Sequence, residues 1–467
     1  MVKLKMPPYR LWIAVMVFMT TFTNYMLRAN ISVSIISMVE KSKKNHTAFC
    51  ATAADNSTKP AAKDTTGSQT FNWSEGDVGW ILSAYFYGYF LTTIPGGVVS
   101  NYIGPWHTLL WSSLGSAVLT GLTPLCAISG GVGGVCASRF FIGFLGGAAY
   151  PAVNDLIAKW APPQEKGKFL AAMMGNTLGT VVTWNLVAAA TSAWGWEWGF
   201  YVLAIFMMVY CIVFGIIVRD RPDLHPWVSD EEKKHILESQ EGHLTKKKGF
   251  PPYHKMLCCN FPFWALAIAQ LGNLWGLNLI ITYAPKFMAE TLGFNIKASA
   301  GLAALPYIGR LIGSNIFGII GDFMRKKDIM SVTKIRKFFI IFSHFIPGLC
   351  LILIRAFGCI KEGVIAMLVL NQGFNGACVV SHLVNAQDLA PNFAGSVYGI
   401  INFFGMTTGI FVPPITGYLN TNYTGFKGPT LIFMIGGIAY IATGAIFIIF
   451  GSAEVQPWNK KEGEEED

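Results

Sequence analysis

The sequence predicts an all-α polytopic membrane protein in which twelve transmembrane helices form two six-helix bundles. Three observations support this fold class: an apolar composition, twelve apolar segments long enough to span a bilayer, and a pattern repeated in the two halves. The chain has 467 residues, of which 52% are hydrophobic and 13% are charged, whereas soluble domains carry about 25% charged residues. A soluble protein of this length could not bury so much apolar surface, so the sequence indicates a membrane protein.

Twelve apolar segments have the length that a membrane-spanning helix requires, about 20 residues. In the first half of the chain they lie at 11–38, 77–99, 106–127, 133–158, 167–190 and 197–218. In the second half they lie at 262–285, 298–322, 335–356, 362–388, 394–419 and 429–450. The first segment is too long for the apolar core of a signal peptide, so we expect it to remain in the protein as a span.

The order of these segments predicts the domain organisation. The interval 219–261 contains the charged stretch "SDEEKKHILESQEGHLTKKK" and is expected to be a cytosolic linker. It separates an N-terminal bundle at 11–218 from a C-terminal bundle at 262–450. Residues 1–10 are expected to form a cytosolic N-terminus, and 451–467 an acidic cytosolic tail.

The distribution of basic residues predicts the orientation in the membrane. With both termini cytosolic, 22 of the 35 Lys and Arg residues lie in cytosolic segments, 10 lie on the opposite side and 3 lie within spans. This is the positive-inside bias.

Four N-glycosylation sequons agree with this orientation, because all of them fall on the external side. Three lie in an external loop at 40–76 and one near the end of the eleventh span: Asn45, Asn56, Asn72 and Asn422. The tails carry no acidic dileucine sorting signal, so we expect the plasma membrane rather than a lysosomal or vesicular one.

The two halves contain related stretches. "GWILSAYFYGYFLTTIPGGVVSNYIG" from Gly79 and "GLAALPYIGRLIGSNIFGIIGDFMRK" from Gly301 align at an offset of 222 residues. "KWAPPQEKGKF" and "DLAPNFAGSVY" align through Pro162 and Pro391. Weak similarity between six-helix halves is typical of transporters built from parallel repeats.

Several motifs resemble those of a known family. "FGIIGDFMRKK" at 317–327 is similar to the loop signature of the major facilitator superfamily. "LRANISV", "NWSEGDVGWILSAYFYGY", "IPGG", "KWAPPQEKGK", "LPY", "NAQDLAP" and "GSAEVQPW" resemble, in that order, the anion–cation symporter family. That family includes type I sodium-phosphate cotransporters, sialin and the vesicular glutamate transporters. The resemblance covers nearly the whole chain and implies the major facilitator fold, alternating access by two bundles and a central anion site.

The chain departs from the family pattern at positions that concern energy coupling and substrate. In sialin-like and glutamate-transporting members the fourth span carries acidic residues and a histidine; here those positions are Ile142, Gly146 and Asn154. The resemblance therefore does not extend to the proton-coupling residues. The seventh-span arginine of glutamate transporters corresponds to Asn273, which disfavours glutamate as the substrate.

Three arginines lie deep within the predicted spans, away from the span ends, namely Arg28, Arg139 and Arg310, and no Asp or Glu lies at comparable depth. A charge in the bilayer interior is costly unless water, helix carbonyls or a counter-ion compensates it. An anionic substrate would do so through bidentate contacts with guanidinium groups. We therefore predict an electropositive central cavity that binds an anion. Snorkelling or an interhelical hydrogen bond remains open for Arg139, and a helix C-terminus for Arg310.

Polar residues on three spans are expected to complete this site. Asn24 and Tyr25 recur with Arg28 at three- and four-residue steps, so they share a helix face. In the tenth span a stripe of polar residues interrupts an apolar helix, and this stripe includes Asn375, His382 and Asn385. Asn273 lies in the seventh span. His382 is the deep group that titrates near neutrality, so it is either a proton carrier or a structural histidine.

A gate is expected at the cytosolic end of the eighth span. Asp322 with Arg325 and Lys326 resembles the charge relay of the superfamily signature, and Asp388 lies near the cytosolic end of the tenth span. The corresponding stretch of the first half, "SNYIGPWH", lacks both the acid and the base. We therefore expect the gates of the two halves to differ.

The leading functional hypothesis is a secondary active transporter of inorganic phosphate or small organic anions, coupled to sodium or driven by membrane potential. One alternative is a proton-coupled lysosomal or vesicular transporter of the sialin type, and another is a receptor that senses an anion without moving it. No nucleotide loop, metal cluster or nucleophile triad occurs, so an enzyme is not expected. We expect no cofactor, no nucleic acid partner and function as a monomer in the lipid bilayer, with Na⁺ or H⁺ as the coupling ion.

Overall fold

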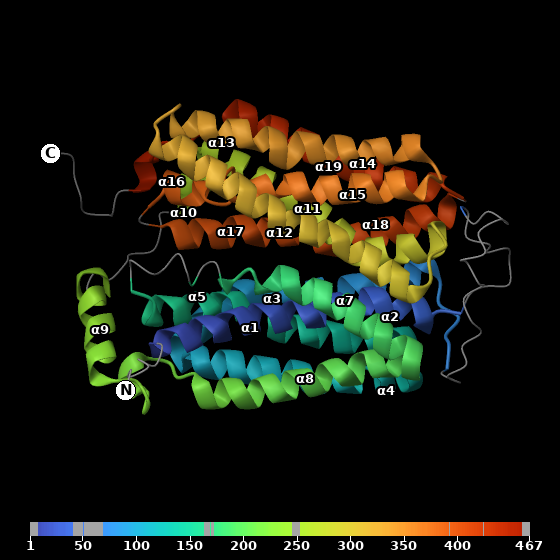
Figure 1. The fold of residues 1–467 in the computed structure, drawn as a ribbon, viewed down its shortest axis with the longest axis horizontal. Coiled ribbons are helices and arrows are strands. Elements are labelled where there is room, and N and C mark those ends of the chain that lie inside the picture. The colour runs from blue at the N-terminus through green and yellow to red at the C-terminus, as the bar shows by residue number, and fades with distance from the viewer. Residues whose placement is uncertain are drawn as a thin grey trace, which may run out of the picture. The chain divides into compact units, whose positions relative to one another are not determined.

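The computed structural model describes residues 8–40, 50, 69–162, 169, 172–244, 253–391, 393–423 and 425–459. Within these ranges the regular elements are helices, apart from one isolated bridge between Val39 and Phe71 (Figure 1). The sequons at Asn45 and Asn56 lie outside the described residues.

The described residues of the first half form seven α-helices that correspond to the first six expected spans. They are α1 (Tyr9–Ala29), α2 (Ile31–Met38), α3 (Glu75–Ile103), α4 (Pro105–Gly146), α5 (Ala149–Trp160), α7 (Gly175–Trp194) and α8 (Trp196–Ile217). The first expected span consists of α1 and α2, which are separated at Asn30. Helix α4 contains the third span and much of the fourth, joined at Gly131, where φ is 54° and ψ is −139°. A residue with a side chain is strained in that conformation, so glycine permits the turn between the two spans.

The linker and the second half follow. The linker contains η1 (Pro222–Leu224), α9 (Asp230–Leu244) and α10 (Tyr253–Cys259). The second half contains α11 (Phe261–Lys286), η2 (Phe287–Thr291), α12 (Ile296–Lys326), α13 (Val332–Ile340), η3 (Ile341–Phe345), α14 (Ile346–Phe357), α15 (Lys361–Asn375), η4 (Gly376–Val379), α16 (Asn385–Leu389), α17 (Ala394–Met406), α18 (Thr408–Asn422), α19 (Lys427–Phe450) and η5 (Pro457–Asn459). The ninth expected span is α13, η3 and α14, the tenth is α15, η4 and α16, and the eleventh is α17 and α18.

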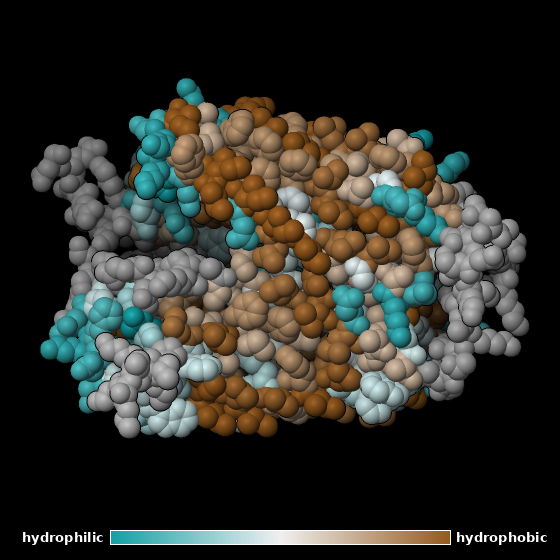
Figure 2. Space-filling model, viewed as in Figure 1, coloured by the Kyte–Doolittle hydropathy of each residue, from teal (hydrophilic) through white to brown (hydrophobic). Residues whose placement is uncertain are grey.

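The predicted fold class is confirmed. Each of the twelve expected spans coincides with described helix, and seven helical segments are long and apolar enough to cross a membrane by length and composition. Large apolar side chains are exposed on their outer faces: on α12, Ile312, Ile316 and Ile319 are 54%, 50% and 71% exposed. Figure 2 shows apolar residues along the helices and hydrophilic residues near the helix ends. This is the surface of a helical protein that contacts lipid.

The described helices belong to two compact units. Unit 1 consists of 1–31 and 87–247, and unit 2 consists of 32–86 and 248–467. Helix α3 therefore contributes its first residues to unit 2 and its remainder to unit 1. The boundary at 247 falls within the expected linker, whereas 32–86 groups with the second half of the chain. The assignment of six spans to each bundle stays a prediction.

Glycines allow close helix packing in both units. A Cβ on Gly179 of α7 would collide with the backbone of Phe22 in α1, within unit 1. In unit 2, a Cβ on Gly313 of α12 would collide with the carbonyl of Gly373 in α15. Small residues let helix backbones approach closely in membranes. The close approach of α12 and α15 brings Arg310 next to the polar face of α15.

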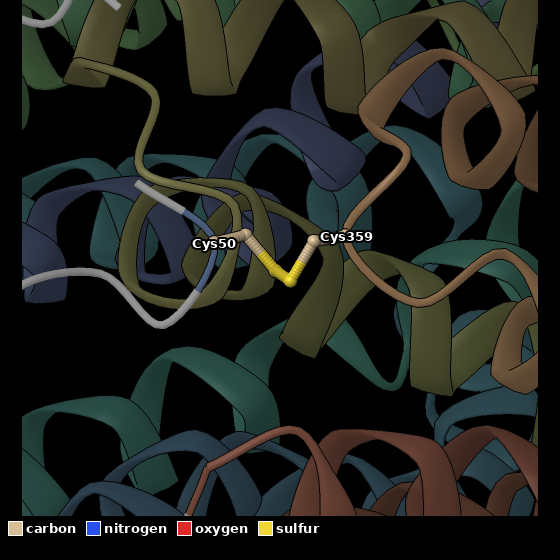
Figure 3. The surroundings of a disulfide bond; sticks show 2 residues. All are labelled: Cys50 and Cys359. Carbon is tan, nitrogen blue, oxygen red and sulfur yellow. A yellow bond between two sulfur atoms is a disulfide. The ribbon is translucent and has the colours of Figure 1, made fainter. Parts of the chain in front are cut away.

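A disulfide bond joins Cys50 to Cys359 within unit 2 (Figure 3). Cys50 belongs to the expected external loop, and Cys359 lies between the ninth and tenth spans. The bond closes a loop of 309 residues in the sequence. Both cysteines lie on the side that the sequence predicts to be external, where disulfides form and persist.

Candidate functional site

In unit 1, Arg139 binds the end of helix α1. Its Nη1 donates to the carbonyl oxygen of Leu27 at 2.7 Å, and its Nη2 donates to the carbonyl oxygen of Arg28 at 3.1 Å. The last carbonyls of a helix lack intrahelical partners, and α1 ends at Ala29 before α2 starts. Trp184 of α7 donates to the Ala29 carbonyl at 3.2 Å. The buried interruption between α1 and α2 is therefore stabilised by side chains from α4 and α7.

Arg28 lies on the last turn of α1 and is 5% exposed. Its Nη1 is 3.4 Å from the hydroxyl of Tyr25, and its guanidinium carbon is 5.1 Å from the centre of the Tyr25 ring. Tyr25 meets the ring of Tyr150 in α5 edge-on, with centroids 6.5 Å apart. One turn earlier, the Asn24 amide donates to the carbonyl of Gly146, at the end of α4, at 3.4 Å. The structure thus brings Asn24, Tyr25, Arg28 and Arg139 together in unit 1.

In unit 2, Arg310 of α12 is surrounded by neutral polar groups. Its guanidinium donates to Oε1 of Gln372 at 3.3 Å, to Oδ1 of Asn375, and to Sγ of Cys378 at 3.4 Å. Gln372 and Asn375 are completely buried. Among the described residues, no ion pair joins Arg310 to a carboxylate. The two amide oxygens and the thiol hold this guanidinium in place, but as neutral groups they do not neutralise its positive charge.

Asn375 connects Arg310 to other spans. Its amide nitrogen donates to Oδ1 of Asn273 in α11 and to the carbonyl oxygen of Ser343 in η3, both at 3.0 Å. Asn273 is the residue at the position of the family's seventh-span arginine, and it is 2% exposed. Three predicted site residues, Arg310, Asn375 and Asn273, therefore form one hydrogen-bonded group.

His382 lies in the same unit, in the turn between η4 and α16. Its Nε2 is 3.0 Å from Oε1 of Gln270, and its Nδ1 is 3.2 Å from the hydroxyl of Ser381. Its ring centroid is 5.1 Å from that of His344. Asn385, predicted to belong to the same stripe, instead donates to the carbonyl of Ser452 at 3.0 Å. Its described contact is thus with the segment that follows α19 rather than with Arg310.

The residues predicted to form a gate occupy two places in unit 2. Asp322, Arg325 and Lys326 are exposed at the C-terminal end of α12. Asp388 accepts two hydrogen bonds from Arg336 of α13, at 2.8 and 3.2 Å. Arg336 also donates to the carbonyl of Val380, at 2.6 Å, in the interrupted part of the tenth span. Sequence reasoning missed Arg336, although a basic residue at the expected cytosolic end of the ninth span was a visible signal.

A second ion pair that sequence reasoning missed lies at the expected outer side of unit 2. Lys286, the last residue of α11, is 5% exposed, and its ammonium is 2.7 Å from both carboxylate oxygens of Glu75. Glu75 is the first residue of α3. Asn420 of α18 is 3.4 Å from the same carboxylate and accepts a hydrogen bond from Tyr283 at 3.2 Å. Three segments of unit 2 thus meet at one ion pair.

The fully buried charged side chains of the described residues are all cationic: Arg28, Arg139, Lys286 and Arg336. Lys286 and Arg336 are paired with Glu75 and Asp388, which are partly exposed. The absence of a fully buried Asp or Glu among the described residues agrees with the sequence prediction. An interior of this kind favours anions over cations.

The linker contacts the expected cytosolic end of unit 1 through His225. Its Nε2 is 3.0 Å from the Ile217 carbonyl, and its Nδ1 accepts from the backbone N–H of Trp227 at 3.2 Å. Burial lowers the pKa of His225, and the positive charges of Arg219 and Lys233 lower this pKa further. Helix α9 adds Glu232, which accepts hydrogen bonds from the backbone N–H groups of Tyr9 and Arg10 at 2.8 and 3.1 Å. These contacts place a carboxylate at the N-terminus of α1, where the helix dipole favours it.

The helices and buried cations define a multi-pass membrane protein with the architecture of a transporter. The family model described as Major Facilitator Superfamily matches residues 13–413, and the chain belongs to this superfamily. A solved structure of a D-xylose-proton symporter superposes on 96% of this chain and 99% of its own with a TM-score of 0.66, at 14% sequence identity. That likeness confirms the fold.

Two relatives indicate to which group of transporters within the superfamily the chain is similar. The chain is 32% identical to a Drosophila melanogaster protein named "Putative inorganic phosphate cotransporter", over 98% of this chain and 87% of the relative. It is 31% identical to human sialin, over 96% of this chain and 90% of sialin. The resemblance to this group of transporters, stated from the motifs, is confirmed.

Proposed function

We propose that the protein is a secondary active transporter that moves inorganic phosphate or small organic anions across a membrane by alternating access. The observation that supports this function most directly is the environment of Arg310. A guanidinium within a span is held by two amide oxygens and a thiol, and no carboxylate of the described residues pairs with it. Such a group is a binding site for a mobile anion rather than part of a permanent ion pair.

The chemistry of the site indicates its substrate class. A guanidinium can donate two parallel hydrogen bonds to a carboxylate or a phosphate, and each charge-assisted hydrogen bond contributes about 1.5–3 kcal/mol. In unit 1, Arg28 with the hydroxyl and ring of Tyr25 offers a second cationic group on a buried helix turn. Phosphate is named for one relative, and sialin is the other. Phosphate fits a site of this charge.

The residues at the family's acidic positions support sodium coupling or a drive by membrane potential. Ile142 and Gly146 have no ionisable side chain, so neither position can carry a proton. Proton coupling is the second candidate, because two buried histidines in unit 2 lie next to the Arg310 group. An anion receptor that does not transport is the remaining alternative.

Several features support an external glycosylated face and cytosolic termini in the plasma membrane. Asn72 and Asn422 are exposed. The bond between Cys50 and Cys359 requires an oxidising compartment on the same side. The protein is expected to act as a monomer without a resident cofactor.

Reconstitution tests this function. The purified full-length protein is placed in liposomes, and uptake of radiolabelled phosphate and glucuronate is measured while sodium, pH and voltage are varied separately. We expect saturable uptake and counterflow of at least one of the two anions. Binding without counterflow would indicate a receptor. Uptake that persists in sodium-free medium at zero voltage, with a pH gradient as the only drive, would replace sodium coupling by proton coupling.

A further inference from the structure

Two interrupted spans of unit 2 meet at a pair of buried histidines. The ninth span contains the π-helical turn η3, which carries Ser343 and His344. The tenth span loses α-helical structure between Asn375 and Asn385, where Ser381 and His382 lie. Single π-helical turns and broken helices within spans occur frequently at functional sites. All four side chains are completely buried.

These four side chains form a continuous chain of polar contacts. Nδ1 of His344 is 2.9 Å from the Ser343 hydroxyl, the two serine hydroxyls are 3.1 Å apart, and the Ser381 hydroxyl is 3.2 Å from Nδ1 of His382. At its ends, Nε2 of His344 faces the carbonyl oxygen of Ala269 and Nε2 of His382 faces Oε1 of Gln270, each at 3.0 Å. The Gln270 amide nitrogen donates to Oδ1 of Asn402 at 3.2 Å, which fixes its oxygen toward His382.

The positions of the protons follow from these partners. A carbonyl oxygen can only accept, so Nε2 of each histidine carries a hydrogen, and in the neutral ring Nδ1 has none. The two serine hydrogens must then serve both bare Nδ1 atoms and the contact between Ser343 and Ser381, and the Ser381 hydroxyl also faces the Cys378 carbonyl oxygen at 3.5 Å. At least one contact of the chain therefore lacks a hydrogen. One added proton on either Nδ1 frees one hydroxyl and completes the chain.

We propose that His344 and His382 form a binding site for one shared proton, and that this proton binds cooperatively with an anion at Arg310. This inference rests on the proposed anion-transport function. Two residues connect the pair to the guanidinium. Asn375 contacts Arg310 and donates to the Ser343 carbonyl, and Cys378 accepts from Arg310 while its carbonyl is 3.5 Å from the Ser381 hydroxyl.

Electrostatics supplies the reason for cooperativity. The titratable or charged groups around the pair are Arg310 of α12, Cys378 of η4 and Tyr440 of α19, whose ring centroid is 5.7 Å from that of His344. The facing groups of α11 and α17 are neutral. Of these groups Arg310 alone is charged, and its positive charge opposes a second cation nearby. An anion bound to Arg310 removes this opposition, and by linkage the proton raises the affinity for the anion equally.

The test compares the pH dependence of the KM for uptake between variants of the full-length protein in liposomes. His344→Gln and His382→Gln remove the site, and Ser381→Ala breaks the chain while both histidines remain. The control is His235→Gln, since His235 is exposed on α9. The probes are radiolabelled phosphate and glucuronate, measured between pH 5.5 and 8 with equal pH on both sides and clamped voltage. Phosphate changes its own charge in this range, but this effect is common to all variants.

We expect the wild type and the control to bind the anion more tightly as the pH falls, by up to about tenfold per pH unit, the limit for one linked proton. The three test variants are expected to lose this slope. The inference is overturned if the folded variants keep the wild-type pH dependence, or if wild-type uptake of glucuronate does not depend on pH. Absence of uptake of either anion by the wild type at every pH is a different result, because it refutes the proposed function and with it the inference.

Discussion

Replacing Arg310 by glutamine removes the positive charge from the group that we assign to anion binding in unit 2. Glutamine keeps polar atoms on α12 that can still contact Gln372 and Asn375. The variant should therefore fold, since it also removes a partly buried charge that has no carboxylate partner among the described residues. What it loses is the pair of charge-assisted hydrogen bonds to the substrate.

The magnitude follows from those bonds. A charge-assisted hydrogen bond contributes about 1.5–3 kcal/mol, and part of this is lost to solvent competition in an open site. A net loss of about 2–3 kcal/mol corresponds to a rise in KM of about 30- to 150-fold. The matched control is Arg355→Gln, because Arg355 is exposed on α14; its KM should stay within about twofold of the wild type, as expected for a surface substitution.

The assay is the initial rate of phosphate uptake over a range of concentrations, normalised to the amount of protein in the liposomes. A change in KM of less than threefold for Arg310→Gln, with normal folding by size-exclusion chromatography, would refute the assignment of Arg310 to the anion site.

Three further predictions concern contacts on both sides of the membrane. Arg139→Met should lower the free energy of unfolding by about 2–6 kcal/mol, because the two carbonyls of α1 that Arg139 binds lose this donor. An unchanged melting temperature with a raised KM would instead show that Arg139 binds the substrate directly. Glu75→Gln should destabilise the protein and change the transport rate, because the buried Lys286 ammonium then loses its close partner and keeps the longer ion pair with Glu290, at 3.7 Å. The double variant Glu75→Gln with Lys286→Met should recover stability, and failure to recover would mean that the pair does not act as a unit. Because the pKa of His225 is lowered in the folded protein, its contribution to stability is complete above the ordinary histidine pKa of about 6.5 and is lost as the pH falls below that value. Thermal melting at pH 5.5 and 7.5 should therefore depend less on pH in His225→Gln than in the wild type. An equal pH dependence of the two proteins would contradict this.

Much of the fold could be predicted from the sequence, because a span is specified locally. Apolar segments of the right length, basic residues between them and sequons on one side do not depend on distant contacts. The interruptions inside the spans were not predictable in this way. The turn η3 lies within the apolar run "FFIIFSHFIPG", where only Ser343 and His344 depart from the pattern.

The candidate site could be predicted only in part, for a related physical reason. The burial cost of a guanidinium made Arg28, Arg139 and Arg310 visible in the sequence. Their partners were not visible, because Arg139 contacts a backbone carbonyl 111 positions earlier and Lys286 pairs with a residue 211 positions earlier. His344 was missed because a single histidine in an apolar run carries no signal of its neighbour His382, 38 positions later in the sequence.

The central claim is that this chain carries an anion across a membrane, and counterflow tests it most directly. Liposomes that contain the purified protein are loaded with unlabelled phosphate or glucuronate and diluted into a trace of the same radiolabelled anion. We expect transient accumulation of label above equilibrium for at least one of the two anions, and weaker accumulation for Arg310→Gln. Binding of label without accumulation, for both anions and with folded protein, would contradict it.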